Sequence, residues 1–229
     1  MATINLLAPF ILSFEGGFVN DKDDRGGATN KGVTINTWKK YGRDIDGDGD
    51  IDVDDLRMIS EADATKIMKR NYWDTLKADK IESQSVANIL VDWFWGSGYS
   101  AIKIVQGMLG IKVDGIVGDQ TINAINAQNP EIFFNQIHKR REKFFRDCVA
   151  SRPQNEKFLK GWLRRLNAIG YGSLTCNGGR KIQFEENTTK AASTSEPSTA
   201  VQEPTLAPAP ASNGNNDKMQ QAANKIFGM

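Results

Sequence analysis

The spacing of apolar residues indicates helices over most of the first 175 positions. Apolar side chains recur there every three or four residues, which places them on one face of an α-helix. Gly, Pro and Asn separate the apolar stretches, and Ser or Thr precedes several of them. The pattern predicts a mainly α protein with helices over residues 7–14, 34–38, 60–73, 83–95, 100–109, 119–127, 130–150 and 154–169.

The first of these helices ends where the pattern changes. An apolar stripe runs along residues 7–14 and stops at Glu15, after which two glycines allow the backbone to turn. Pro9 is tolerated only if it falls in the first turn of the helix. Residues 18–33, rich in Gly, Asp and Thr, favour a small β-hairpin.

Composition divides the chain near residue 187. All five tryptophans and all but one of the phenylalanines precede this point, whereas four of the seven prolines follow it among Thr, Ser, Ala and Asn. Such a segment buries too little apolar surface to offset its ordering entropy. We expect folded regions over residues 1–95 and 96–175, a disordered linker over 176–217 and a short C-terminal helix over 218–229.

Overall composition excludes several classes of protein. The 229 residues carry 29 Lys and Arg against 28 Asp and Glu, so no global charge directs the protein to nucleic acid or to a membrane. Two cysteines and one histidine disfavour a four-ligand zinc site. No apolar run approaches the roughly 20 residues that cross a bilayer, and the N-terminus lacks the basic start of a signal peptide. We expect synthesis in the cytoplasm, and carboxylates as the acids and bases of any enzymatic site.

The segment from Glu15 to Thr34 carries the strongest chemical signal. A carboxyl group at the end of an apolar helix, half surrounded by apolar groups, keeps its proton near neutral pH. Asp24 follows Glu15 by nine residues and Thr29 follows by five more, so a hairpin could return both toward Glu15. Glycoside hydrolysis needs such groups on the two sides of the scissile bond. The alternative is that Glu15 caps turn amides while the aspartates are solvated in a loop.

The run EGGFVNDKDDRGGATNKGVT, which begins at Glu15, resembles glycoside hydrolase family 108. Members of that family include N-acetylmuramidases and phage endolysin-type lysozymes. The resemblance continues through Tyr72-Trp73-Asp74, residues 92–98, residues 112–118 and residues 161–165, the last two in a region described as a predicted peptidoglycan-binding domain. It implies a lysozyme-like α+β fold in which Glu15 is the catalytic acid.

Aromatic residues near these motifs suit a carbohydrate surface, because tryptophan combines an apolar face with a polar edge. We expect substrate contacts from Tyr72, Trp73, Asp92 and Trp95. The alternative is that most of the aromatic residues belong to the core. At helical spacing Trp93 and Trp95 point to different faces, so at most one of them lines the site.

Residues 44–55 match the EF-hand calcium loop independently of the motifs above. The pattern D-x-D-x-D-G supplies oxygen ligands, and Gly49 allows the sharp turn. Without a cation, the seven acidic residues of this loop would repel one another. The alternative is a solvated acidic turn. We expect a structural calcium ion, with no cofactor for catalysis, held by Asp44, Asp46, Asp48, Asp50, Asp52 and Asp55.

Positive charge gathers in residues 139–165, which hold ten Lys or Arg against three acidic residues. The simplest interpretation is the solvated side of two amphipathic helices. The alternative is attraction to an anionic cell wall or membrane surface. No nucleic-acid motif accompanies this charge, so DNA binding is the weaker version of that alternative. The partner that the resemblance implies is bacterial peptidoglycan, and we expect a monomeric protein.

Together these features predict a peptidoglycan hydrolase that cleaves the β-1,4 bond between N-acetylmuramic acid and N-acetylglucosamine and lyses the wall after release or dedicated export. Glu15 would protonate the leaving oxygen, Asp24 would stabilise the transition state or position water, and Thr29 would help hold that water. Three alternatives stay open. They are a lytic transglycosylase, a calcium-responsive interaction module, and a non-catalytic wall-binding or secretion-associated protein, the last favoured by Gly96 where the family pattern has asparagine.

Overall fold

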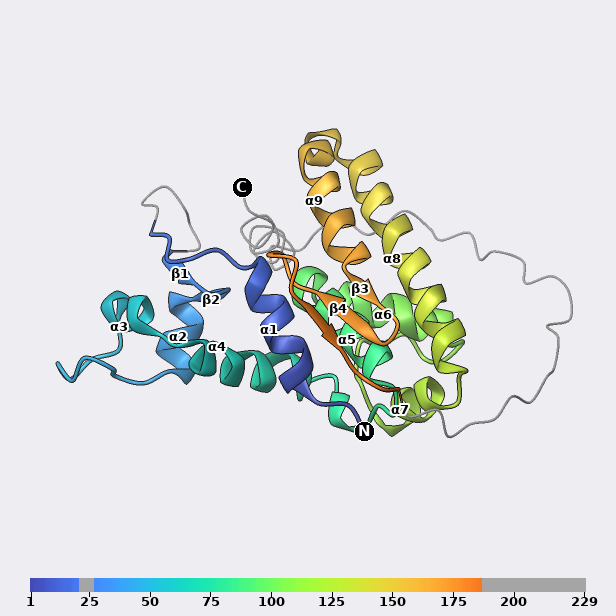
Figure 1. Ribbon diagram of the computed structural model, residues 1–229, viewed down its shortest axis with the longest axis horizontal. Helices are drawn as coiled ribbons and strands as arrows, with labels where there is room; N and C mark the ends of the chain where they lie inside the picture. Colours follow the sequence, from blue (N-terminus) through green and yellow to red (C-terminus); the bar gives the residue numbers. More distant parts are fainter. Residues whose placement is uncertain (21–26, 187–229) are drawn as a thin grey trace, which may run out of the picture.

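The protein is mostly helical with two small antiparallel sheets (Figure 1), as seen in a computed structural model that describes residues 1–20 and 27–186. A π-helical turn (Lys69–Trp73) extends α4, and 3-10 turns cover Ala78–Lys80 and Pro153–Asn155. None of the helices in the described ranges has the length and apolar character needed to cross a membrane. The helices are α1 (Ile4–Phe14), α2 (Ile35–Tyr41), α3 (Val53–Met58), α4 (Glu61–Met68), α5 (Gln84–Ser97), α6 (Tyr99–Met108), α7 (Asp119–Asn126), α8 (Pro130–Ser151) and α9 (Glu156–Asn167).

Side-chain caps account for several of the predicted helix starts. The Thr34 hydroxyl accepts a hydrogen bond from the third residue of α2, and the Ser83 hydroxyl does the same at the start of α5. Ser60 and Asp63 form a capping box before α4, in which each side chain accepts a hydrogen bond from the other residue's backbone N–H. These local predictions are confirmed.

Pro9 does not lie where we expected it. Because the Thr3 hydroxyl caps α1, the helix begins at Ile4 and Pro9 falls in its interior rather than its first turn. The proline costs about 3 kcal/mol there, since it removes one helical hydrogen bond. Burial of large apolar side chains contributes about 1.5–3 kcal/mol each and outweighs that cost, the buried residues of α1 being Ile4, Leu7, Ala8, Phe10 and Ile11.

A hairpin forms at the end of the segment 18–33 in which it was predicted, where β1 (Thr29–Asn30) and β2 (Val33–Thr34) pair antiparallel with Asn30 opposite Val33. The two turn residues, Lys31 and Gly32, have φ values of +48° and +76°. Positive φ at both central positions is typical of the type I′ turn, whose twist matches that of the strands. The turn is therefore tight and fixed in direction.

A second sheet was not predicted from the sequence. Strands β3 (Ile169–Gly170), β4 (Ser173–Thr175) and β5 (Lys181–Gln183) form an antiparallel meander. The predicted linker over 176–217 therefore starts too early. Beyond β5, a carboxylate oxygen of Glu186 accepts a hydrogen bond from the backbone N–H of Ser85 at 2.6 Å. The remainder of that prediction, residues 187–217 and the C-terminal helix over 218–229, lies outside the described residues.

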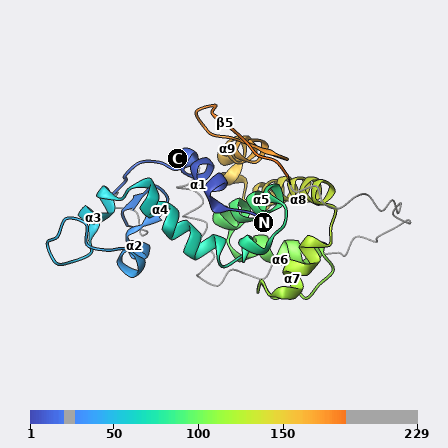
Figure 2. The ribbon, with the colours of Figure 1, turned by 60° about the horizontal axis from the view of Figure 1, so that its bottom comes forward.

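Two apolar cores organise the described residues. In the ribbons of Figures 1 and 2, α2, α3 and α4 lie to one side of α1, and α5 to α9 lie to the other. The smaller core joins the β1–β2 hairpin, α2, α3 and α4, while the larger joins α1, α5 to α9, β3 and β4. Leu12 of α1 packs against both. Helix α5 crosses the predicted boundary at residue 95, and the larger core continues on both sides of it.

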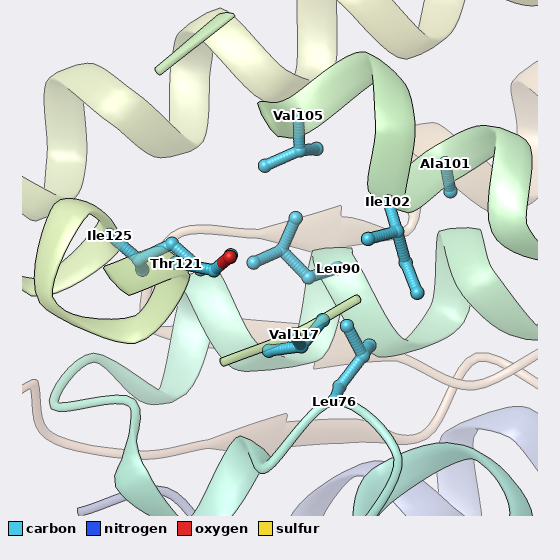
Figure 3. Close-up of a pocket in the computed structure, with 8 residues that line it drawn as sticks. All are labelled: Leu76, Leu90, Ala101, Ile102, Val105, Val117, Thr121 and Ile125. Atoms are coloured by element: carbon cyan, nitrogen blue, oxygen red, sulfur yellow. The ribbon is translucent and has the colours of Figure 1, made fainter. Parts of the chain in front are cut away.

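Figure 3 shows a small pocket between α5, α6 and α7. Its only polar group in that view is the Thr121 hydroxyl, which donates to the carbonyl of Ile116 at 3.4 Å. All of its lining residues are buried, so we attribute the pocket to side-chain packing within the larger core. The lining consists of Leu76, Leu90, Ala101, Ile102, Val105, Val117, Thr121 and Ile125.

Candidate active site

Glu15 lies directly after α1, where the backbone leaves the helical conformation. Its φ and ψ are −80° and 144°, and its N–H donates to the carbonyl of Leu12 at 3.2 Å. The side chain turns inward and is only 2% exposed. The predicted position, a carboxyl group carried by the end of an apolar helix, is confirmed.

One oxygen of the Glu15 carboxyl group accepts two hydrogen bonds. Oε1 accepts from the indole N–H of Trp95 at 3.0 Å and from Nη1 of Arg165 at 3.2 Å. Trp95 belongs to α5 and Arg165 to α9. Three helices that are distant in the sequence therefore meet at this carboxyl group.

The other oxygen of Glu15 faces the turn of the β1–β2 hairpin. A Cβ atom placed on Gly32 would lie 3.0 Å from Oε2 of Glu15 and 2.6 Å from Cζ2 of Trp95. Only glycine, which has no Cβ, lets the turn approach so closely. The hairpin turn thus covers the side of the carboxyl group that the helices leave free.

Burial raises the pKa of Glu15 from 4.5 to about 7. The charge of Arg165 and the hydrogen bonds from Arg165 and Trp95 act in the opposite direction, and the negative charge of Asp92 adds to the rise. Burial therefore outweighs the stabilisation of the carboxylate. A carboxyl group with this pKa retains a proton near neutral pH, as a general acid must.

Asp92 lies behind Arg165, at the centre of a fully buried charge cluster. Oδ1 accepts from Nε and Nη2 of Arg165 at 3.0 and 2.7 Å, and Oδ2 accepts from Nη2 of Arg141 at 2.7 Å. Burial raises the pKa of Asp92, but the two arginines outweigh burial and hold that pKa below its usual range. The prediction of substrate contact by Asp92 is corrected, because its side chain is inaccessible and both oxygens face arginines.

The predicted aromatic residues divide between site and core. Trp73 is fully buried and donates its indole N–H to Asp79 at 2.6 Å, so the prediction of sugar contact by Trp73 is also corrected. Trp95 reaches Glu15, and the ring of Tyr72 packs on Trp95 with 4.5 Å between ring centroids. Burial raises the pKa of Tyr72 to about 12, so its phenol stays neutral beside the carboxyl group.

Asp24, the predicted partner of Glu15, lies outside the described residues. Thr29 lies in β1, where its backbone N–H and carbonyl each pair with Val19 at 2.8 Å. Through this pairing Thr29 helps frame the hairpin whose turn covers Glu15. The predicted contact of its hydroxyl with water stays a prediction.

Sequence reasoning missed Arg141 and Arg165, which it grouped with the solvated basic residues of 139–165. Both are 1% exposed. Their spacing along the helices could have identified them as buried, because each arginine lies on the apolar face of its helix. Arg141 lies four residues from both Ile137 and Phe145, and Arg165 lies beside Leu166 at three residues from Trp162. An arginine in such a position indicates a buried ion pair.

The acidic loop at 44–55 lies between α2 and α3 and folds its carboxylates over backbone N–H groups. Asp44 accepts from Gly47 and Gly49 at 2.6 and 3.0 Å. Repulsion is present as expected, since the charge of Asp48 raises the pKa of Asp50. Carboxylate oxygens are the ligands that Ca²⁺ prefers. Asp55 differs from the other predicted ligands, because its Oδ1 already accepts the backbone N–H groups of Ile45 and Asp46 and its Oδ2 accepts that of Asp52. Ligand oxygens lie within 4.8 Å of one another in two groups, Asp44, Asp46 and Asp48, and Asp50, Asp52 and Asp55.

Two families match the chain in succession. The sequence model described as Glycosyl hydrolase 108 matches residues 8–98, the span that holds Glu15, the hairpin and Trp95. Residues 8–98 are therefore similar to the glycosyl hydrolase 108 family. The model described as Predicted Peptidoglycan domain matches residues 100–167, which hold Arg141 and Arg165. The two matches together support a protein that acts on peptidoglycan.

Among solved structures, that of Brucella abortus SagA is similar to this chain. The two chains are 27% identical, with a TM-score of 0.55, over 70% of this chain and 87% of that chain. The likeness covers more of the chain than either family segment alone. Comparison with curated proteins found no significant match.

Proposed function

We propose that the protein is an N-acetylmuramidase, which hydrolyses the β-1,4 bond between N-acetylmuramic acid and N-acetylglucosamine in peptidoglycan. The observation that carries this proposal is the buried carboxyl group of Glu15, whose pKa of about 7 keeps a proton available. Protonation of the leaving oxygen is the step that such a group performs in glycoside hydrolysis. The matched segment at 100–167 supports peptidoglycan as the polymer.

The hydrogen bonds of Glu15 indicate which oxygen carries the proton. Oε1 accepts two N–H groups, from Trp95 and Arg165, so in the neutral acid the proton belongs on Oε2. After transfer, the same two donors stabilise the negative charge left on the carboxylate. Oε2 is therefore the atom that meets the glycosidic oxygen.

Asp24 and Thr29 keep their predicted roles within this proposal. Asp24 would stabilise the positive charge that develops on the sugar or position the attacking water, and Thr29 would help hold that water. Asp92 does not fill the role of second carboxylate, because two arginines neutralise it inside the core.

Substrate entry requires movement of the hairpin turn. The side chain of Glu15 is almost inaccessible, and Oε2 faces Gly32. The strands of the hairpin are only two residues long, and its main anchor outside the strands is the side chain of Asn30, which donates to the carbonyls of Leu56 and Arg57. Movement of the turn as a unit would belong to the class of loop motions that gate active sites.

Digestion of purified peptidoglycan by Glu15→Gln tests the proposal. The amide keeps the size and hydrogen-bonding capacity of the side chain but has no transferable proton, so we expect cleavage to fall by at least about 100-fold. Glu82→Gln, at an exposed position, is the matched control and should cleave like wild type. Unchanged melting temperatures show that both variants fold. Near-normal cleavage by Glu15→Gln would reject Glu15 as the acid, whereas absence of cleavage by the wild-type protein would leave a non-catalytic wall-binding role.

We also propose that residues 44–55 bind one Ca²⁺ ion with a structural role. The spacing of the aspartates and the convergent oxygens of Asp44, Asp46 and Asp48, the first three ligand positions of the EF-hand pattern, support this proposal. The ion would offset the repulsion between the carboxylates and hold the loop between α2 and α3. Calcium chemistry takes no part in the proposed cleavage.

A further inference from the structure

Arg165 connects the segment matched as a predicted peptidoglycan domain to the carboxyl group of Glu15. It lies in α9 and is 1% exposed. Its partners are distant in the sequence, with Asp92 73 residues away and Glu15 150 residues away. The contact therefore forms only when α9 docks against α1 and α5.

Asp92 fixes the direction in which Arg165 points. Two nitrogens of the guanidinium, Nε and Nη2, donate to Oδ1 of Asp92, which sets the plane of the group. Arg141 holds the other oxygen of Asp92 at 2.7 Å. With its plane set in this way, Arg165 directs Nη1 at Oε1 of Glu15.

The same groups adjust the charge around Glu15. Arg165 stabilises the carboxylate form, while Asp92 repels it and also shares the guanidinium. Tyr72 is the other titratable group that interacts with Glu15 in the described part of the chain, and its phenol is neutral. Arg165 and Asp92 thus act on the pKa of Glu15 in opposite directions.

We propose that Arg165 is a positioning residue for Glu15, held by Asp92 and Arg141, and that residues 100–167 complete the active site rather than only anchoring the protein to the wall. The inference rests on the proposed function, since the reaction is the one that Glu15 would catalyse. Arg165 occupies Oε1 and so leaves Oε2 to carry the proton. Arg165 itself stays buried and out of contact with the substrate.

The pH profile of peptidoglycan cleavage by two full-chain variants tests this inference. The alkaline limb of this profile is the fall in cleavage rate as Glu15 loses its proton. Arg165→Met removes a positive charge and a hydrogen-bond donor, so this limb should move to higher pH by about one unit or more. Asp92→Asn removes a negative charge, so the limb should move downward. Lys160→Met, at an exposed position of the same helix, should leave the limb unchanged. If Arg165 and Asp92 had only a structural role, both variants would have lower melting temperatures but the alkaline limb of wild type. That result would overturn the inference.

Arg165→Lys is a second variant that tests the inference if Arg165→Met does not fold. Lysine keeps the charge but cannot bond Asp92 and Glu15 in one plane, so the limb should stay close to that of wild type while kcat falls about tenfold or more and KM changes little. Wild-type kcat in Arg165→Lys would overturn the positioning role.

Carbon-13 NMR titration of the glutamate carboxyl groups measures the pKa of Glu15 without catalysis. The Glu15 signal is assigned by its absence in Glu15→Gln. Opposite shifts in Arg165→Met and Asp92→Asn support the inference, and an unchanged titration in both variants overturns it. Opposite shifts combined with full activity of Glu15→Gln would overturn the proposed function, and with it the role of Arg165 in cleavage, although the charge coupling would stand.

Discussion

Burial of the Glu15 carboxyl group favours proton donation but lowers the stability of the folded protein when the group is charged. Its burial favours the neutral acid, which is the form that donates a proton, and disfavours the charged form. Arg165 and Trp95 reduce that penalty without removing it. The proton-donating form is therefore obtained at the expense of stability above neutral pH.

Comparing the stability of Glu15→Gln and wild type across pH tests this balance. The pKa of Glu15 is about 7 in the folded protein and 4.5 ordinarily. Protonation of Glu15 therefore contributes fully to the free energy of unfolding below pH 4.5, and this contribution is lost as pH rises through 7. The free energy of unfolding of wild type should therefore fall, relative to the variant, by at most about 3 kcal/mol over that window. Urea unfolding at several pH values measures it. Parallel curves for the two proteins would contradict the raised pKa.

Single residues were predictable where local chemistry decides their role. Glu15 stands out in the sequence because an apolar helix stops there and glycines follow. Which of several tryptophans reaches Glu15 was not predictable, because it depends on how α5 packs against α1. Trp73 and Trp95 each follow another aromatic residue in the sequence, yet one donates to Asp79 in the core and the other to Glu15.

Among the elements, the hairpin illustrates both the reach and the limit of prediction. The sequence predicted a hairpin within residues 18–33, and the structure places its turn at Lys31 and Gly32, where both φ values are positive. The contact that anchors the hairpin could not be predicted from the sequence, because it joins distant residues. The buried side chain of Asn30 donates to the carbonyls of Leu56 and Arg57 at 2.8 and 3.1 Å. Strands β3 to β5 were missed because two or three residues are too few to show an alternating pattern.

Gly32→Ala should destabilise the protein and slow peptidoglycan cleavage. The positive φ costs an L-residue about 1–2 kcal/mol, and the new methyl group would also collide with Trp95 and Glu15. Gly110→Ala is a matched control, since Gly110 also has positive φ, +66°, but open space around its Cα. Melting temperatures and cleavage rates of both variants measure the difference. Equal effects on both would show that the turn does not press on Glu15.

Removal of calcium should loosen the acidic loop. An ion that binds only the folded loop stabilises by about 2.7 kcal/mol at a hundredfold excess over Kd. EDTA should therefore lower the melting temperature by several degrees, and Asp44→Ala combined with Asp48→Ala should remove this response. Asp54→Ala, at an exposed position of the loop that offers no ligand in the EF-hand pattern, should keep it. Absence of calcium uptake up to millimolar concentration in calorimetry would leave an acidic turn without a metal.

On the scale of the whole molecule, the two family segments share one site. The sequence predicted a region before residue 95 and a helical region after it, and the matches at 8–98 and 100–167 divide the chain at nearly the same place. The structure adds that the larger core and the charge cluster of Asp92, Arg141 and Arg165 continue across the division. No local pattern encodes such contacts, because they depend on the docking of helices far apart in the sequence.

The central claim is hydrolysis on the reducing side of N-acetylmuramic acid, and mass spectrometry of the released fragments tests it most directly. Digestion of purified peptidoglycan by wild-type protein, followed by borohydride reduction, identifies the sugar at each new end. We expect every cleavage to add one water molecule and to leave reduced N-acetylmuramic acid, with no such fragments from Glu15→Gln. Fragments that lack the added water and end in an anhydro sugar, as a lytic transglycosylase produces, or fragments that end in N-acetylglucosamine, would contradict the account.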